Sequence, residues 1–277
     1  MKKRSLLFVP ANSEKMVNKG LESNSDIVIF DLEDAVAYSE KENARKILFN
    51  SLSNINEKNK FFIRVNEPKS NLYKEDIKLL SELENVNFVI PKVESKDEVL
   101  KLEEILKRKK SDKKIIPIIE TAKGLWNALE IATSSHLIET LAFGAEDFSL
   151  DIDAKVSEDG KELNHARSKL VIISRVAEIE APIDTVYTNF KNPEGFRKEA
   201  EMVRALGFQG KLLIHPNQID LANEKFTPTY EEIENAKKII EAFKKAENEG
   251  LAAIEVDGKM VDYPIVNKAE RILELSE

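Results

Sequence analysis

The chain has 277 residues, with 42 Lys and Arg, 50 Asp and Glu, and no cysteine. The lack of cysteine excludes disulfide frameworks, thiolate metal sites and cysteine nucleophiles. The net charge of −8 argues against nucleic-acid binding, which needs a basic face. The first apolar run, residues 6–9, is too short for a signal peptide or a spanning helix. We therefore expect a soluble, cytoplasmic protein with no nucleic-acid or membrane partner.

Short runs of β-branched and aromatic residues alternate with longer charged segments of helical periodicity. The predicted strands are residues 4–9, 26–31, 60–65, 86–91, 115–120, 140–144, 184–188 and 211–215. The predicted helices are residues 13–22, 40–53, 72–84, 96–110, 122–134, 161–180, 194–206 and 229–248. Ser39 with Glu42, and Thr229 with Glu232, have the spacing of a capping box at the start of a helix.

Eight strand–helix pairs predict an α/β protein of the (β/α)8 TIM-barrel class. The alternative is an open doubly wound sheet, which typically has a glycine-rich turn after its first strand. Residues 8–13 contain no glycine, so the barrel is favoured. We assign residues 1–249 to this catalytic barrel. Residues 250–277, with a turn at 256–259, lie outside the eight pairs, and we expect this C-terminal extension to pack on a neighbouring subunit.

Charged side chains stand at the ends of successive predicted strands, where the chemistry of such barrels is located. They are Asp31, Glu33 and Asp34 after the second strand, Arg64 in the third, Lys92 after the fourth, Glu120 in the fifth and Asp147 after the sixth. Because the carboxyl ends of barrel strands face one mouth, we expect these side chains to converge on one site.

Glu120 and Asp147 come from neighbouring strands and are candidate metal ligands. Two carboxylates, with the remaining positions left to substrate and water, suit Mg²⁺. Each acid also has a structural explanation, since Glu120 can favour a helix N-terminus and Asp147 can cap a turn. Jointly they favour a metal site.

Arg64 and Lys92 are the cations of the predicted mouth. A guanidinium suits bidentate binding of a substrate carboxylate, but an ion pair with the acidic residues 31–34 is an equally simple role for Arg64. Glu33 and Asp34 are then supporting residues that hold cations inside the mouth. Lys92 is a candidate Schiff-base nucleophile, which needs a lowered pKa, whereas the nearby Glu94 favours an ordinary charged lysine.

Ordered motifs run through nearly the whole chain. They are residues 4–10 (RSLLFVP), 31–36 (DLEDAV), 63–66 (IRVN), 91–92 (PK), 119–121 (IET), 143–147 (FGAED), 184–187 (DTVY), 207–211 (GFQGK), 214–219 (IHPNQI) and 258–264 (GKMVDYP). In this order they resemble the citrate lyase β-subunit family of the HpcH/HpaI aldolase superfamily, which includes malyl-CoA and citramalyl-CoA lyase-type enzymes.

The resemblance implies a Mg²⁺ ion held by Glu120 and Asp147, with Arg64 binding the substrate carboxylate. It implies that Asp262 is the catalytic acid/base, delivered from the C-terminal segment to a neighbouring subunit of a homotrimer. Lys15 and Lys19 match positions that contact CoA in the free-standing relatives, although a solvated helix face is an equally good explanation for these two lysines.

We therefore predict a Mg²⁺-dependent carbon–carbon lyase that cleaves a citryl-, malyl- or citramalyl-type 3-hydroxyacyl thioester to a 2-oxo acid, such as oxaloacetate, and an acyl thioester. The carrier is CoA or an acyl carrier protein, and other subunits of a citrate lyase complex are possible partners. His215 departs from dedicated citrate lyase subunits and Ala35 from CoA-type enzymes, so the carrier stays open. The alternatives are a Mg²⁺-dependent aldolase acting on free 2-oxo acids and a non-catalytic partner subunit.

Overall fold

Eight parallel strands form a closed barrel, as the sequence predicts, and an open sheet is excluded. In this computed structural model, which describes residues 1–55, 57, 60–109, 112–157 and 159–276, every strand pairs with the next, and the first pairs with the eighth. The strands are β1 (Ser5–Pro10), β2 (Ile27–Asp31), β3 (Phe61–Arg64), β4 (Asn87–Ile90), β5 (Ile115–Ile119), β6 (Ala142–Phe143), β7 (Ile183–Asp184) and β8 (Gly210–Leu213).

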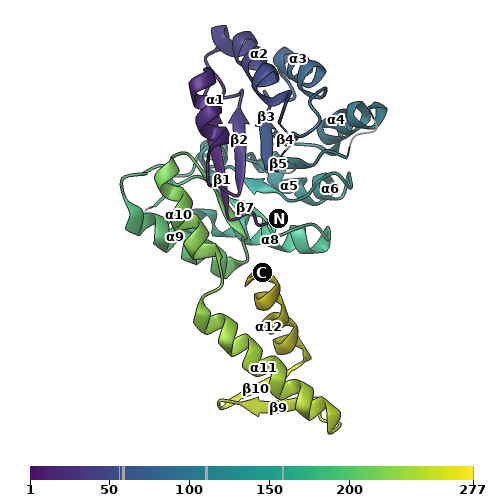
Figure 1. Cartoon of the computed structure of the whole chain (residues 1–277), viewed down its shortest axis with the longest axis vertical. Helices are drawn as coiled ribbons and strands as arrows, with labels where there is room; N and C mark the ends of the chain where they lie inside the picture. The colour runs from purple at the N-terminus through teal and green to yellow at the C-terminus, as the bar shows by residue number, and fades with distance from the viewer. Residues whose placement is uncertain (56, 58–59, 110–111, 158, 277) are drawn as a thin grey trace. The chain divides into compact units, whose positions relative to one another are not determined.

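Helices follow the strands and cover the outside of the barrel (Figure 1). They are α1 (Glu14–Leu21), α2 (Lys41–Leu52), α3 (Asn71–Leu80), α4 (Lys96–Arg108), α5 (Ala122–Trp126), α6 (Ala128–Ala132), α7 (Ala145–Asp151), α8 (Asn164–Val176), α9 (Pro193–Leu206) and α10 (Ile219–Phe226). The predicted helix 96–110 ends at Arg108 in the structure, and residue 110 lies outside the described residues.

The barrel interior is filled by apolar side chains from the strands. This core consists of Leu6, Ile27, Ile29, Phe62, Val89, Ile116, Ile118, Ala142, Ile183 and Leu212, with Phe8 and Val186 packed against it. All five residues of β2 and of β5 are buried, because their outward side chains are covered by helices. This double burial explains why the strands are continuously apolar in sequence instead of alternating.

Residues 224–276 form a second compact unit, separate from the unit of residues 3–223. It contains α11 (Tyr230–Asn248), the hairpin strands β9 (Ala253–Val256) and β10 (Lys259–Asp262), and α12 (Tyr263–Ser276). Its core is Phe243 with Val256, Val261 and Val266. The turn predicted at 256–259 is confirmed, with Asp257 and Gly258 at φ 49° and 75°, as a two-residue hairpin turn requires.

The assignment of residues 229–248 as the eighth barrel helix is wrong. A shorter helix, α10, follows β8, and the chain enters the second unit within it. Residues 229–248 form α11, whose apolar residues Ile239, Ile240 and Phe243 pack in the core of the second unit. The observed division therefore precedes the expected boundary after residue 249.

One of the two predicted capping boxes forms. The hydroxyl of Thr229 accepts a hydrogen bond from the Glu232 N–H at 3.2 Å, and Glu232 accepts one from the Thr229 N–H at 2.7 Å. The box predicted at Ser39 and Glu42 is wrong, because residues 38–40 form a short 3-10 turn and α2 starts at Lys41 without a side-chain cap.

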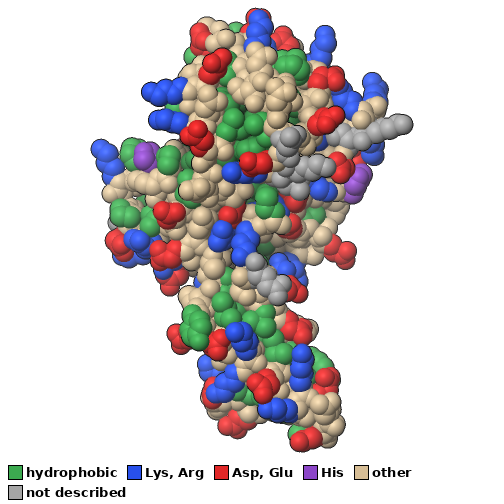
Figure 2. All heavy atoms as spheres, viewed as in Figure 1, with side chains coloured by type: hydrophobic (Ala, Val, Ile, Leu, Met, Phe, Trp, Pro, Cys, Tyr) green, Lys and Arg blue, Asp and Glu red, His purple; other side chains and the backbone are tan. Residues whose placement is uncertain are grey.

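The surface carries charges of both signs. Lys and Arg side chains are interspersed with Asp and Glu on the face that Figure 2 shows. Over the described part of the chain, no helix combines the length and apolar character needed to cross a membrane.

Candidate functional site

A cavity of about 380 Å³ lies at the carboxyl ends of the barrel strands. Its lining comes from seven of the eight strand ends and includes Pro10, Asp31, Arg64, Glu120, Gly144, Asp147, Thr185 and Ile214. The strand-end residues that the sequence predicts to converge therefore do so in the case of Asp31, Arg64, Glu120 and Asp147, whereas Glu33 and Lys92 do not line the cavity. Asp34 also lines the cavity.

Arg64 is held in the cavity wall by a two-pronged pair with Asp31. Its Nε donates to Asp31 Oδ1 at 2.8 Å and its NH2 to Oδ2 at 2.6 Å, and its guanidinium lies 4.5 Å from the centre of the Phe8 ring. Burial by itself lowers the pKa of Arg64, but the charges of Asp31 and Glu33 outweigh it and raise that pKa above its ordinary value. The guanidinium is therefore a fixed positive charge.

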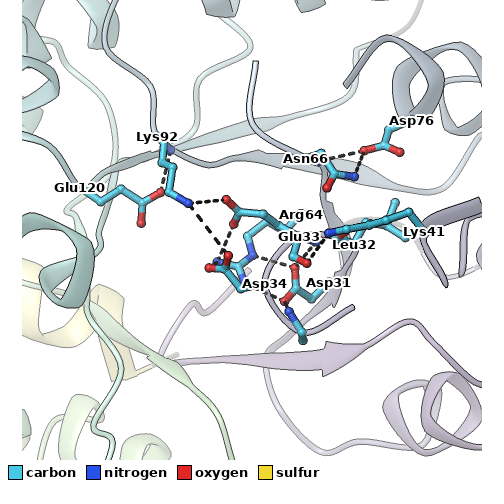
Figure 3. A network of polar contacts seen from close by, with 11 residues as sticks. Asp31, Leu32, Glu33, Asp34, Lys41, Arg64, Asn66, Asp76, Lys92 and Glu120 are labelled. Atoms are coloured by element: carbon cyan, nitrogen blue, oxygen red, sulfur yellow. Dashed lines mark hydrogen bonds and ion pairs between the residues drawn. The ribbon is translucent and has the colours of Figure 1, made fainter. Parts of the chain in front are cut away.

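Asp31 also shapes the acidic loop after β2. Its Oδ1 accepts from the N–H of Glu33 at 2.8 Å, and its Oδ2 accepts from the N–H of Ala35 at 3.1 Å. Below this loop, the buried Lys41 donates to the carbonyl of Leu32 at 2.6 Å and to that of Glu33. The loop is thus fixed by side chains at both of its ends (Figure 3).

Glu120 follows β5 and is 3% exposed. Desolvation, together with the negative charges of Glu33 and Asp147, raises the pKa of this carboxyl to about 8. Its Oε1 accepts a hydrogen bond from the backbone N–H of Lys92 at 2.7 Å. Burial beside a second, cavity-lining carboxyl disfavours the charged form of Glu120. A divalent cation bound to the carboxylate would stabilise that charged form.

Asp147 reaches the same cavity from the first turn of α7. Strands β5 and β6 pair through Ile119 and Phe143, which brings the residues after both strands together. The start of α7 is fixed by Thr185, whose hydroxyl accepts from the N–H of Ala145 at 3.0 Å. In the described part of the chain, no group of three or more His, Cys, Asp or Glu side chains is arranged to hold a metal, so a cation here would take its other ligands from water or substrate.

Lys92 does not have the properties of a Schiff-base nucleophile. Its Nζ donates to Glu33 Oε1 at 2.9 Å and lies 4.0 Å from Asp34 Oδ1 (Figure 3). Burial lowers its pKa, but the bond to Glu33 and the charges of Glu33 and Asp34 outweigh this and raise the pKa above its ordinary value. A Schiff-base lysine needs the opposite shift, so the alternative of a charged, ion-paired lysine is favoured.

Five predicted residues do not line this cavity: Glu33 and Lys92, which lie beside Arg64 and Glu120, and Lys15, Lys19 and Asp262. Lys15 and Lys19 are exposed on α1, one turn apart. Asp262 ends β10 in the second unit, where its Oδ1 accepts from the N–H of Ile265 at 3.4 Å.

The family of the chain follows from comparison with known proteins. Residues 4–216 match the family described as HpcH/HpaI aldolase/citrate lyase. The chain belongs to this family. It is 37% identical to the citrate lyase subunit β of Haemophilus influenzae over 98% of the chain and 96% of that protein, and 34% identical to the human mitochondrial citramalyl-CoA lyase over 99% and 85%.

A solved structure of similar architecture is the Mycobacterium tuberculosis protein CitE in complex with magnesium, acetoacetate and coenzyme A. The TM-score is 0.83 at 26% identity, and the match covers 98% of this chain and 97% of that one. The predicted resemblance to the citrate lyase β-subunit and citramalyl-CoA lyase group is therefore confirmed for this HpcH/HpaI family member.

Gly144 and Lys41 also shape the site of this HpcH/HpaI family member, although the sequence alone predicts no role for either residue. A Cβ on Gly144 would lie 2.3 Å from Glu120 Oε2, so only glycine leaves this space. Its place at the end of the predicted strand 140–144, just before the acidic pair at 146 and 147, was the one indication in the sequence. Nothing in the sequence indicates the role of Lys41, because its burial and its hydrogen bonds to backbone carbonyls depend on the tertiary structure.

Proposed function

We propose that the chain is a Mg²⁺-dependent carbon–carbon lyase that cleaves a citryl-, malyl- or citramalyl-type 3-hydroxyacyl thioester to a 2-oxo acid and an acyl thioester. The observation that carries this proposal is the meeting of buried Glu120, Asp147 and the fixed guanidinium of Arg64 in one cavity. The names of the relatives and the magnesium and coenzyme A bound by CitE support it.

Glu120 and Asp147 are the residues that would hold the cation. The chemistry of the donor set fits, since both are carboxylates and hard oxygen ligands suit Mg²⁺. The charge fits as well, because the pKa of Glu120 is raised by burial and by neighbouring acids, which a cation would relieve. When bound, Mg²⁺ would lower the pKa of the substrate hydroxyl and stabilise the oxygen of the forming 2-oxo acid.

Arg64 binds the carboxylate of the 2-oxo acid half of the substrate. Two of its five N–H groups are taken by Asp31, which fixes the plane of the guanidinium, and NH1 lies 3.1 Å from Glu33 Oε2 without a hydrogen bond to it. Phe8 covers one face of that plane. The apolar side chains of Ile118, Val186 and Leu212 complete the cavity around the reacting atoms.

Asp262 of a neighbouring subunit is the acid/base. In the cleavage direction a base takes the proton of the 3-hydroxyl, the C–C bond electrons pass to the thioester enolate, and an acid returns a proton to that carbon. The second unit exposes Met260, Tyr263 and Ile265 around Asp262, an apolar surface that suits contact with another subunit. Such a head-to-tail contact closes into a ring, for which we propose a homotrimer.

The thioester carrier is CoA or an acyl carrier protein. The exposed pair Lys15 and Lys19 would meet the phosphates of CoA. Among the relatives, one is named as a citrate lyase subunit and another as a CoA-thioester lyase, so both carriers, and association with citrate lyase subunits, are retained in the proposal. We propose a cytoplasmic location.

The test is a direct assay of 2-oxo acid release. Citryl-, malyl- and citramalyl-thioesters, each on CoA and on carrier protein, are offered to the purified chain with Mg²⁺ and with a chelator. We expect Mg²⁺-dependent release from at least one of them, and its loss in Asp147→Asn with the fold retained. Cleavage of free 2-oxo acid aldols with no thioester turnover would instead assign the chain to free-acid aldolases, and no turnover of either kind would contradict catalysis.

A further inference from the structure

Glu33 lies between the two cations of the cavity mouth but pairs with them unequally. Its Oε1 accepts a hydrogen bond from Lys92 Nζ at 2.9 Å. Its Oε2 lies 3.1 Å from Arg64 NH1 yet makes no hydrogen bond, although its side chain is only 7% exposed. The carboxylate is therefore aligned toward Lys92 and only close to Arg64 (Figure 3).

Arg64 has one edge left for a ligand. Asp31 occupies Nε and NH2 through two hydrogen bonds, so NH1 is the nitrogen whose partner is open to change. The acids near NH1 are Glu33 and, at 3.7 Å, Asp34. The side chain of Asp34 is 60% exposed and that of Glu33 is 7% exposed, so water screens the charge of Asp34 more strongly than that of Glu33.

Lys92 is fixed at both of its ends. Its backbone N–H donates to Glu120, and its φ of 51° lies in the left-handed region, which a lysine adopts only when its surroundings require it. The side chain reaches Glu33, so that a single residue after β4 joins Glu120, which follows β5, to the acidic loop after β2 (Figure 3).

We propose that Lys92 is a positioning residue: its ammonium holds Glu33 and so keeps the NH1 edge of Arg64 available to the carboxylate of the 2-oxo acid. The inference rests on the proposed role of Arg64 in binding that carboxylate. Without the ammonium, the buried carboxylate of Glu33 has Arg64 as its nearest remaining cation. It would then close onto NH1 and compete with the ligand.

The experiment measures binding of oxaloacetate and of pyruvate, each by calorimetry in the presence of Mg²⁺, together with the Kd of Mg²⁺ alone. In Lys92→Met we expect the Kd of the bound 2-oxo acid to rise by about tenfold and that of Mg²⁺ to change by no more than about twofold. Lys92→Arg, which keeps the charge, should stay within about threefold of the natural chain.

The deciding variant combines Lys92→Met with Glu33→Gln. If Lys92 acts by holding the charge of Glu33, removal of that charge restores 2-oxo acid binding to within about threefold of the natural chain. A lysine that only supports the fold would give no such rescue. The matched control is Lys96→Met, which breaks an exposed pair with Glu130 at 2.6 Å and should leave both Kd values unchanged.

Two results with folded variants, and one with the natural chain, overturn the proposal. The role of Lys92 is refuted if Lys92→Met binds the 2-oxo acid with the same Kd as the natural chain, or if adding Glu33→Gln to Lys92→Met does not restore that Kd. Either result leaves the proposed function intact. Failure of the natural chain to bind either acid removes the inference and the role of Arg64 together. If Lys92→Met unfolds, Lys92→Gln replaces it as the neutral variant of closer polarity, with the same expectations.

Discussion

Gly144 leaves the space that the carboxylate of Glu120 occupies. A Cβ at position 144 would lie 2.3 Å from Oε2 and 2.6 Å from the Cβ of Glu120, well inside contact distance. The side chain of Glu120 is also fixed on its other side by the N–H of Lys92. The residue that follows β5 therefore depends on a glycine after β6 for its orientation.

Gly144→Ala should weaken the proposed metal site. The added methyl group forces the Glu120 carboxylate away from its observed position, so we expect the Kd of Mg²⁺ to rise by about tenfold. Calorimetry gives this value, and thermal unfolding without metal shows whether the barrel persists. A folded variant with unchanged Mg²⁺ affinity would exclude Glu120 as a ligand in its observed orientation.

Arg64→Lys should reduce kcat/KM by about tenfold, on the order of 1.4 kcal/mol. An ammonium cannot reproduce the planar fork that binds Asp31 and the substrate carboxylate at once. The matched control is Arg4→Lys, which alters a similar pair with Asp26 outside the cavity. We expect the control to leave kcat/KM unchanged. If Arg64→Lys has the same kcat/KM as the natural chain, Arg64 only forms a structural ion pair and does not bind the substrate carboxylate.

The metal-free protein should lose stability as the pH rises toward 8, in part because of Glu120. The pKa of this carboxyl is 4.5 in an ordinary setting and about 8 in the folded chain. Between these values the folded chain binds more protons than the unfolded chain, so the free energy of unfolding falls as the pH rises. Glu120→Gln removes this contribution.

Urea unfolding in a chelating buffer at several pH values measures the effect. From pH 5 to pH 8, the free energy of unfolding of the natural chain should fall relative to that of Glu120→Gln. A constant difference over this range would mean that Glu120 titrates near its ordinary pKa in the folded chain.

Two inactive variants should restore activity to each other if Asp262 acts across subunits. In a mixed ring of Asp262→Ala and Asp147→Ala chains, some sites combine the intact Asp147 of one chain with the intact Asp262 of its neighbour. With equal amounts and random mixing, about one quarter of the sites are complete. Activity assays after verified subunit exchange measure this, and no recovery would assign Asp262 to its own chain's site or remove it from catalysis.

The order of elements along the chain is enough to predict the barrel. Continuous apolar runs such as residues 27–30 and Ile115–Ile119 are local features, and their burial on both faces follows from the composition of each run. The meeting of Glu120 and Asp147 was predictable for the same reason, because consecutive barrel strands are neighbours and their carboxyl ends face one mouth.

Only the tertiary structure decided which partners these groups take. The sequence leaves Asp31, Glu33 and Asp34 as equivalent partners for Arg64. The two hydrogen bonds from Arg64 to Asp31 depend on the register of β2 and β3, which places these two residues side by side. The helix 229–248 has the same local pattern whether it covers the barrel or the hairpin, and long-range packing of Phe243 assigns it to the second unit. Periodicity reports which face of an element is buried, whereas the surface that covers this face is a non-local property of the folded chain.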